Sequence, residues 1–201
     1  MSSLATNIML GGVGGQGLVL MTKIICQAGL MDQYDVKSND VVGLSQRGGM
    51  VWGNVRIGDK IYSPNIRPKE ADILLGMEPL EAYRWCSLLK DKGKIILNSK
   101  RFYPVPVQQE QEKYPEEDIE SMKKRYETFE INAFDEGVKL GKKQVANVIL
   151  IGILAKVLEN EGETPIKVDI WKASIKQNVP TKAIDMNMNA FDLGYNFPRF
   201  Y

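Results

Sequence analysis

Five glycines fall within seven residues near the start of the chain, in the stretch GGVGGQG at residues 11–17. Apolar residues flank this stretch: NIML at 7–10 precedes it, and LVLMTKII follows it. This pattern predicts a short buried strand that leads through a glycine turn into a helix. We expect the helix from Gln16 to about Leu30, with an apolar surface covered by a sheet and by a further layer or another subunit.

The later pattern predicts an α/β fold. Gly58-Asp59 separates two alternating runs, MVWGNVRI and KIYS, which favours a two-residue hairpin. Two buried strands, at 71–76 and 93–99, flank a helix, so this part of the sheet should be parallel. We predict a three-layer α/β/α fold with a mixed, mostly parallel sheet and one β-hairpin, Rossmann-like but not a dinucleotide fold. Further strands are expected at 34–38, 50–57 and 128–132, and helices at 79–89, 119–126, 133–140, 145–158, 168–177 and 182–193.

Composition limits the chemistry of this chain. The 201 residues contain no histidine, which excludes Ser-His and Cys-His catalytic pairs and histidine-ligated metals. Two cysteines cannot fill the four thiolate positions of an ordinary iron–sulfur cluster. Lysine and arginine number 26 and aspartate and glutamate 25, so net charge attracts neither nucleic acid nor an acidic membrane.

We expect one cytoplasmic domain over residues 1–201. The N-terminus lacks the basic segment of a signal peptide. The most apolar later run, at 145–155, is shorter than the ~20 residues that a membrane-spanning helix needs. Two cysteines form no disulfide framework, which favours a reducing compartment. An exposed connection is expected at 105–118 and an aromatic tail at 194–201.

The spacing Gly12-x-Gly14-x-x-Gly17 is that of a dinucleotide-binding turn. That interpretation also needs an acid about 20 residues later and a crossover helix after the second strand. Asp35 is expected inside the second strand and Asp40 just past it, and the short segment at 39–49 cannot supply the helix. Two other interpretations stay open: a turn that lets strand and helix pack closely, and a loop that contacts an anion or a partner.

A second glycine-containing loop follows at GLSQRGG, residues 43–49. Arg47 in this loop could present a bidentate donor to phosphate or carboxylate, or could pair with a surface acid. The ordered series GGVGGQG, GLSQRGGMVWGNVRIGD, SPNI and EADILLGMEPLEAYR closely resembles the gamma-type domain of the 2-oxoacid:ferredoxin oxidoreductases. SQRGG, EPLEAYR and a C-terminal AFDLGY are most similar to the beta subunit of the indolepyruvate type. The resemblance covers most of residues 7–196.

This resemblance implies a subunit of an enzyme that oxidatively decarboxylates a 2-oxo acid, indolepyruvate or another aryl pyruvate, with coenzyme A. The products are an acyl-CoA, carbon dioxide and reduced ferredoxin. It implies that a large alpha subunit carries thiamine diphosphate, Mg²⁺ and [4Fe-4S] clusters, so this chain acts in a hetero-oligomer and is inactive alone. The expected contacts to coenzyme A or to the partner are Gly12, Gly14, Gln16, Gly17, Ser45, Gln46, Arg47, Gly48 and Gly49.

Two alternatives accompany this hypothesis. One is a free-standing oxidoreductase that binds NAD or a flavin at the glycine turn, and the other is an assembly subunit without a ligand. The sequence also departs from the family at Val42, where relatives often carry a histidine, while Asp40 stands where an acid is expected.

Several other residues invite a functional interpretation. Cys26 and Cys86 are expected to be small core residues. Acids at 78 and 81 are expected to offset the dipole of the helix that they begin, although strand ends of this kind also form binding sites. Lys142-Lys143 could attract coenzyme A phosphates or remain solvated beside a core helix. The C-terminal aromatics are expected to contribute to a subunit interface, together with the glycine-turn helix. They are Phe191, Tyr195, Phe197, Phe200 and Tyr201.

Overall fold

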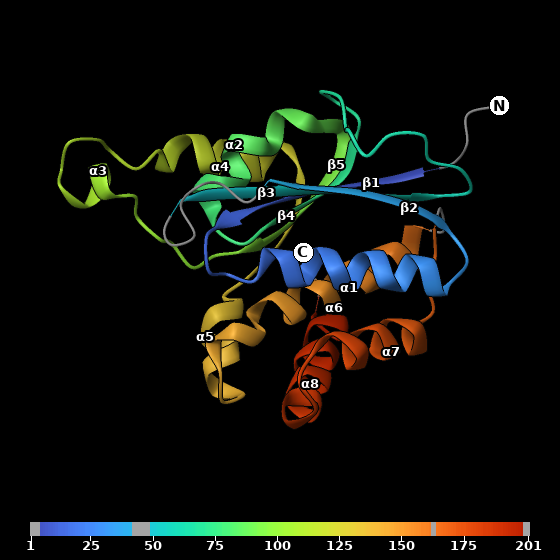
Figure 1. The fold of residues 1–201 in the computed structure, drawn as a ribbon. Helices are drawn as coiled ribbons and strands as arrows, with labels where there is room; N and C mark the ends of the chain where they lie inside the picture. The colour runs from blue at the N-terminus through green and yellow to red at the C-terminus, as the bar shows by residue number, and fades with distance from the viewer. Residues whose placement is uncertain (1–4, 42–48, 162–163, 199–201) are drawn as a thin grey trace.

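The computed structural model describes residues 5–41, 49–161 and 164–198 of the chain. In these residues one sheet runs through the middle of the molecule in the strand order β2-β3-β1-β4-β5-β6 (Figure 1). The strands are β1 Ala5–Val13, β2 Asp35–Val41, β3 Met50–Gly58, β4 Ala71–Gly76, β5 Leu89–Asn98 and β6 Glu127–Ile131.

The sheet is mixed and mostly parallel, as predicted. β1, β4, β5 and β6 pair in parallel, whereas β3 is antiparallel to both of its neighbours, β1 and β2. The parallel strands therefore end together, at Val13, Gly76, Asn98 and Ile131. We call this side of the sheet the carboxyl edge and the opposite side the amino edge.

The predicted hairpin at Gly58-Asp59 is wrong in position. β3 already pairs with β1 on one side and with β2 on the other, so neither side is free for a strand at 60–63. The chain after Gly58 instead packs against the sheet: Ile61 is buried and its N–H donates to the Asp35 carboxylate at 2.9 Å. The antiparallel neighbours that follow each other in sequence are β2 and β3. β2 also extends further than expected, so Asp40 lies within it.

Helices cover both faces of the sheet (Figure 1). α2 and α4 lie on one face, while α1, α6, α7 and α8 lie on the other, with α5 beside them. Proline at the first position and a Glu78 side-chain cap begin α2. The α-helices are α1 Leu18–Met31, α2 Pro79–Trp85, α3 Val105–Gln108, α4 Glu116–Arg125, α5 Ala133–Lys139, α6 Ala146–Glu161, α7 Val168–Asn178 and α8 Ile184–Tyr195.

α6 is the central helix of the larger core, which explains its nearly continuous apolar sequence. Its described residues from Val148 to Ala155 are buried, and they belong to one cluster with side chains of α1, β3 and α8. α6 and α8 cross closely: a Cβ on Gly194 would lie 1.9 Å from the Ile149 carbonyl oxygen. The two backbones can approach this far only because glycine has no side chain.

The two segments expected to be exposed, the connection at 105–118 and the C-terminal aromatic tail, differ in how far they are buried. No residue from 105 to 118 is buried, although this stretch forms α3 and the start of α4. Among the C-terminal aromatics, Phe191 is fully buried and stacks on Tyr195, and Phe197 packs against the same core. Phe191 therefore cannot belong to a subunit interface, because its side chain is buried in the core of this chain. Phe200 and Tyr201 lie outside the described residues.

Candidate functional site

The glycine turn joins the end of β1 to the start of α1 at the carboxyl edge. Gly17 caps α1 with φ 83°, and a Cβ there would lie 2.6 Å from the Asn147 side-chain nitrogen. Asn147 belongs to the first turn of α6 and donates to the Gly17 carbonyl at 3.4 Å. The Asn147 side-chain oxygen is buried without a hydrogen-bond partner. The turn therefore brings the N-terminal ends of α1 and α6 together.

Gln16 holds the turn in this shape. Its side-chain oxygen accepts from the Val13 N–H at 2.7 Å, and its amide donates to the Met77 carbonyl at 3.2 Å. The Gln16 oxygen also lies against Gly12, where a Cβ would come within 2.9 Å of it. Gln16 and Gly12 thus tie the ends of β1 and β4 together, which is a positioning role.

Asn98 extends the same network to β5 and α5. It is buried at the end of β5, where its amide donates to the Met77 carbonyl at 3.0 Å. Its oxygen accepts from the Phe134 N–H at 3.4 Å, at the start of α5. The sequence analysis missed Asn98, although a polar residue directly after a buried apolar strand marks the edge where α/β sheets bind ligands.

A cavity of about 180 Å³ opens beside the turn. Polar groups enter it from three places in the sequence: the turn, the end of β5, and the 3-10 helix Lys143–Val145 that precedes α6. Neither α1 nor α6 has an acidic residue in its first turn. The unpaired N–H groups at helix starts attract anions, and the start of α1 lies here beside the 3-10 helix that leads into α6. The lining residues are Val13, Gly14, Gly15, Gln16, Met77, Asn98, Phe102, Phe134, Lys143, Gln144 and Ala146.

Two lysines flank one aromatic ring at this cavity. The Lys100 and Lys143 Nζ atoms lie 5.2 Å and 5.5 Å from the centre of the Phe134 ring, and Phe102 meets that ring edge-on. Cations held over an aromatic face remain available to an anion in front of them. Lys143 was predicted either to attract phosphate or to stay solvated; it is exposed and lines the cavity. The arrangement of charges and rings therefore suits an anionic group next to an apolar one.

The second glycine-containing loop, residues 43–49, contacts the glycine turn through its last residue. The Gly14 N–H donates to the Gly49 carbonyl at 2.8 Å. Residues 42–48 lie outside the described residues, and with them Val42, Ser45, Gln46, Arg47 and Gly48. The structure thus joins Gly49 to Gly14, and the roles expected of the other loop residues stay predictions.

The acids that begin α2 serve that helix, as expected. Glu78 is fully buried, accepts from the Glu81 N–H at 3.0 Å, and receives the Tyr114 hydroxyl at 2.6 Å. Glu81 pairs with Arg84 at 2.6 Å, but its second oxygen is buried without a partner. Burial raises the pKa of the Glu81 carboxyl to about 7, despite the opposing effect of Arg84.

The strand order contradicts binding of a dinucleotide at the glycine turn. In a dinucleotide-binding fold the strand after the first helix lies parallel beside the first strand, but here the antiparallel β3 separates β2 from β1. Asp35 begins β2 at the amino edge, opposite Gly58. Its carboxylate is engaged by Lys37 at 2.7 Å and by the Ile61 N–H. It is remote from the turn and cannot hold a ribose there.

The described residues do not fit a metal centre. They contain no group of three or more His, Cys, Asp or Glu side chains that could hold a metal ion. Cys26 and Cys86 are half-buried and pack on different clusters on opposite faces of the sheet, so they cannot ligate one cluster. Among these residues no helix is long and apolar enough to cross a bilayer.

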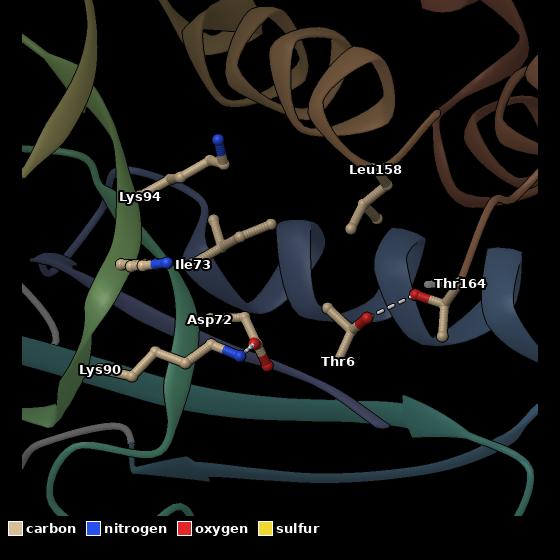
Figure 2. A pocket seen from close by; sticks show the side chains of 8 residues that line it. Thr6, Asp72, Ile73, Lys90, Lys94, Leu158 and Thr164 are labelled. Atoms are coloured by element: carbon tan, nitrogen blue, oxygen red, sulfur yellow. Dashed lines mark hydrogen bonds and ion pairs between the residues drawn. The ribbon is translucent and has the colours of Figure 1, made fainter. Parts of the chain in front are cut away.

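A second cavity, at the amino edge, is also rich in lysine (Figure 2). Two of its three lysines have acidic partners: Lys90 pairs with Asp72, as Figure 2 shows, and Lys94 pairs with Glu127. Thr6 and Thr164 hydrogen-bond to each other at 2.5 Å across its wall. Because two of its three lysines are already paired with acids, this cavity suits an anion less well than the one at the carboxyl edge.

The sequence matches the family model for pyruvate ferredoxin/flavodoxin oxidoreductase over residues 7–197. The chain belongs to this family. Indolepyruvate oxidoreductase subunit IorB of Pyrococcus horikoshii is 35% identical over 94% of this chain and 93% of the relative. IorB of Thermococcus kodakarensis gives the same identity and shares. The common gamma subunit of the Pyrococcus furiosus pyruvate/ketoisovalerate oxidoreductases is 27% identical over 72% of this chain and 74% of its own.

Solved structures of this family share the fold. A keto/oxoacid ferredoxin oxidoreductase gamma subunit from Geobacter sulfurreducens has a TM-score of 0.69 and 21% identity, covering 94% of this chain and 96% of that one. A 2-oxoglutarate:ferredoxin oxidoreductase from Magnetococcus marinus has a TM-score of 0.73 and 16% identity, covering 97% of this chain but 31% of that one. These matches confirm the resemblance to the gamma-type domain and to the indolepyruvate type. This chain is therefore a subunit of an oxidoreductase complex.

Proposed function

We propose that this chain is the small subunit of an indolepyruvate-type 2-oxoacid:ferredoxin oxidoreductase, and that the carboxyl-edge cavity binds a phosphate group of coenzyme A. The complex would convert an aryl pyruvate and coenzyme A to an acyl-CoA and carbon dioxide, with the electrons passing to ferredoxin. The observation that carries this proposal is the 35% identity to IorB over 94% of the chain. The neighbouring 2-oxoglutarate enzyme is described with coenzyme A bound, which supports the choice of ligand.

Thiamine diphosphate, Mg²⁺ and [4Fe-4S] clusters are assigned to a large partner subunit in this proposal. The described residues of this chain offer neither thiolate sets nor an acid cluster for them. This chain would contribute the helix starts of α1 and α6, the Lys100 and Lys143 cations and the Asn98 network. These groups hold and orient an anion. A cavity of about 180 Å³ fits a phosphate and its neighbouring atoms, and leaves the rest of the coenzyme for the partner.

The complex tests the proposed activity. We expect the co-expressed large and small subunits to reduce a viologen dye with indolepyruvate, dependent on coenzyme A, and either subunit alone to be inactive. Pyruvate and 2-oxoglutarate serve as comparison substrates. Full activity of the large subunit without this chain would contradict the proposal, and a preference for a non-aryl acid would contradict its substrate.

Lys143→Ala tests the cavity. Removing one exposed cation beside a phosphate is expected to raise the KM for coenzyme A roughly 2–5-fold with kcat little changed, because the contact is the same in ground and transition states. Lys92→Ala is the matched control: Lys92 is also exposed but lines the amino-edge cavity. An equal rise in the KM for coenzyme A from both substitutions would show that the net charge of the chain, and not the position of Lys143, determines this KM.

Arg47→Ala tests the second loop, whose role rests on the sequence alone. A raised KM for coenzyme A in a complex that still assembles would support a contact with the ligand. Loss of assembly with an unchanged KM in the residual complex would instead favour the assembly function.

A further inference from the structure

A third cavity, of about 370 Å³, lies at the β6 end of the sheet. Its wall comes from β5 and β6, from the second half of α6, and from the end of α8 with the two residues that follow it. Among the described residues it shares no lining residue with the carboxyl-edge cavity. Small-molecule sites have volumes of about 300–1,000 Å³, so this cavity has room for a whole small ligand. We call it the β6-edge cavity.

Aromatic side chains reach the β6-edge cavity from both sides. Phe129 comes from β6, Tyr195 ends α8, and Phe197 follows that helix. The Tyr195 ring is held in place, because it stacks on the fully buried Phe191 with ring centres 5.9 Å apart. Apolar side chains of α6 complete the wall. Since aromatic rings pack well against other rings, edge-on or offset, this wall favours a flat aromatic ligand.

The charges beside the cavity are matched within the chain. Two lysines line it: Lys94 pairs with Glu127, and Lys156 donates to Glu159 at 2.6 Å. An ion that entered the cavity would lose hydration, and the charges it met there would already be paired. The electrostatics therefore favour a ligand without net charge.

Two side-chain amides supply uncharged polar groups to the wall. Asn160 lies in the last turn of α6, and Asn196 follows α8. The Asn196 nitrogen donates to the Asp192 carbonyl at 2.8 Å, so its oxygen is the atom available to accept from a ligand. A ligand that suits this wall carries an N–H or O–H group on or beside its ring.

We infer that the β6-edge cavity binds a small aromatic molecule that has no net charge and carries a hydrogen-bond donor. Neutral indole and zwitterionic L-tryptophan both have this chemistry. An anionic aryl acid shares the ring but adds a charge that the wall does not match. The site is separate from the carboxyl-edge cavity, and the inference does not depend on binding of coenzyme A there.

Calorimetric titration of the full chain tests the inference. Indole or L-tryptophan should bind with a Kd of about 1 mM or tighter, as expected for ligands of this size. L-Leucine and indole-3-acetate should bind at least ~10-fold more weakly. Failure of both indole and tryptophan to bind would overturn the inference. Equal binding of leucine would overturn the aromatic preference, and tighter binding of indole-3-acetate would overturn the absence of net charge.

Substitutions in the wall test where the ligand lies. Phe129→Leu removes one ring and should raise the Kd roughly 3–10-fold. Asn196→Ala removes the acceptor at an exposed position and should raise it roughly 2–5-fold. Phe102→Leu, a half-buried ring at the carboxyl-edge cavity, and Asn189→Ala, an exposed amide of α8, are the matched controls and should change it less than about 2-fold. Equal weakening by controls and wall variants would overturn the placement.

Competition separates this inference from the proposed function. Saturating coenzyme A should leave the Kd of the aromatic ligand unchanged, because the two cavities have separate walls. Displacement of the aromatic ligand by coenzyme A would overturn the separate site. Binding of the aromatic ligand by a chain whose complex makes no use of coenzyme A would support this inference and contradict only the proposed function.

Discussion

Glu81 carries a buried carboxyl with one oxygen that lacks a partner. The oxygen lies in the interface between α2 and the sheet, where the indole nitrogen of Trp85, one turn later in α2, is also buried without a partner. Trp85 packs on Trp52 with ring centres 5.0 Å apart. An ionised carboxylate in such surroundings is poorly solvated, which is why burial raises the pKa of Glu81 to about 7.

Glu81→Gln should change how stability depends on pH. Since the folded pKa of about 7 exceeds the ordinary glutamate pKa of 4.5, the folded state binds more protons between these values, and stability falls as pH rises through this window. The unaltered chain should lose ~2–3 kcal/mol of unfolding free energy between pH 5 and pH 8 from this group. The variant should lack that part of the slope in urea unfolding at the two pH values. The exposed Glu112→Gln is the control, and an unchanged slope in Glu81→Gln would contradict the assignment.

Some residues of the site could be predicted from the sequence, and others could not. The glycine turn was evident because a dense glycine run between apolar segments has few other uses. Asn98 and Phe134 were missed because their role depends on neighbours distant in the chain: Asn98 bonds to the Met77 carbonyl and to the Phe134 N–H. Lys143 was noticed only as one of two lysines, and its position at the cavity depends on how α5 and α6 meet.

Contact between α6 and α8 is the tightest helix crossing that the glycines reveal. Gly194→Ala would place a Cβ 1.9 Å from the Ile149 carbonyl oxygen and 3.2 Å from the Gly152 Cα, all of it backbone that cannot rotate away. We expect a loss of at least ~2 kcal/mol, or roughly 4–8 °C in melting temperature for a chain of this length. Asn189→Ala, exposed on the same helix, is the control. A variant with the melting temperature of the unaltered chain would contradict this expectation, because it would show that α6 and α8 can move apart without a loss of stability.

Elements were predicted better than their connections. The strand at 71–76 and most helices were found within a few residues, because apolar periodicity and cap residues are local signals. The hairpin after Gly58 failed because the turn signal says nothing of which strand edges are free. β3 is sandwiched between β1 and β2, so a tight turn there has no edge on which to pair the next strand.

The whole molecule has two cores, one on each face of the sheet, and the described residues contain no group of three or more His, Cys, Asp or Glu side chains that could hold a metal ion. We therefore expect the isolated chain to fold cooperatively and to keep its melting temperature in excess chelator, unlike a domain whose folding requires zinc. Thermal unfolding with and without EDTA is the measurement. A melting temperature that falls on chelation, or visible absorption by the purified chain, would contradict this expectation.

The sequence by itself determined the family, the α/β class and the position of the glycine turn, because these depend on ordered local motifs and on short-range periodicity. It also excluded histidine chemistry and a complete cluster ligand set through composition. Only the tertiary structure decided that β3 separates β1 from β2, and that the starts of α1 and α6 meet beside Lys143 and Asn98. These features join residues far apart in sequence, and their contacts form only when the sheet orders its strands and the helices pack on it.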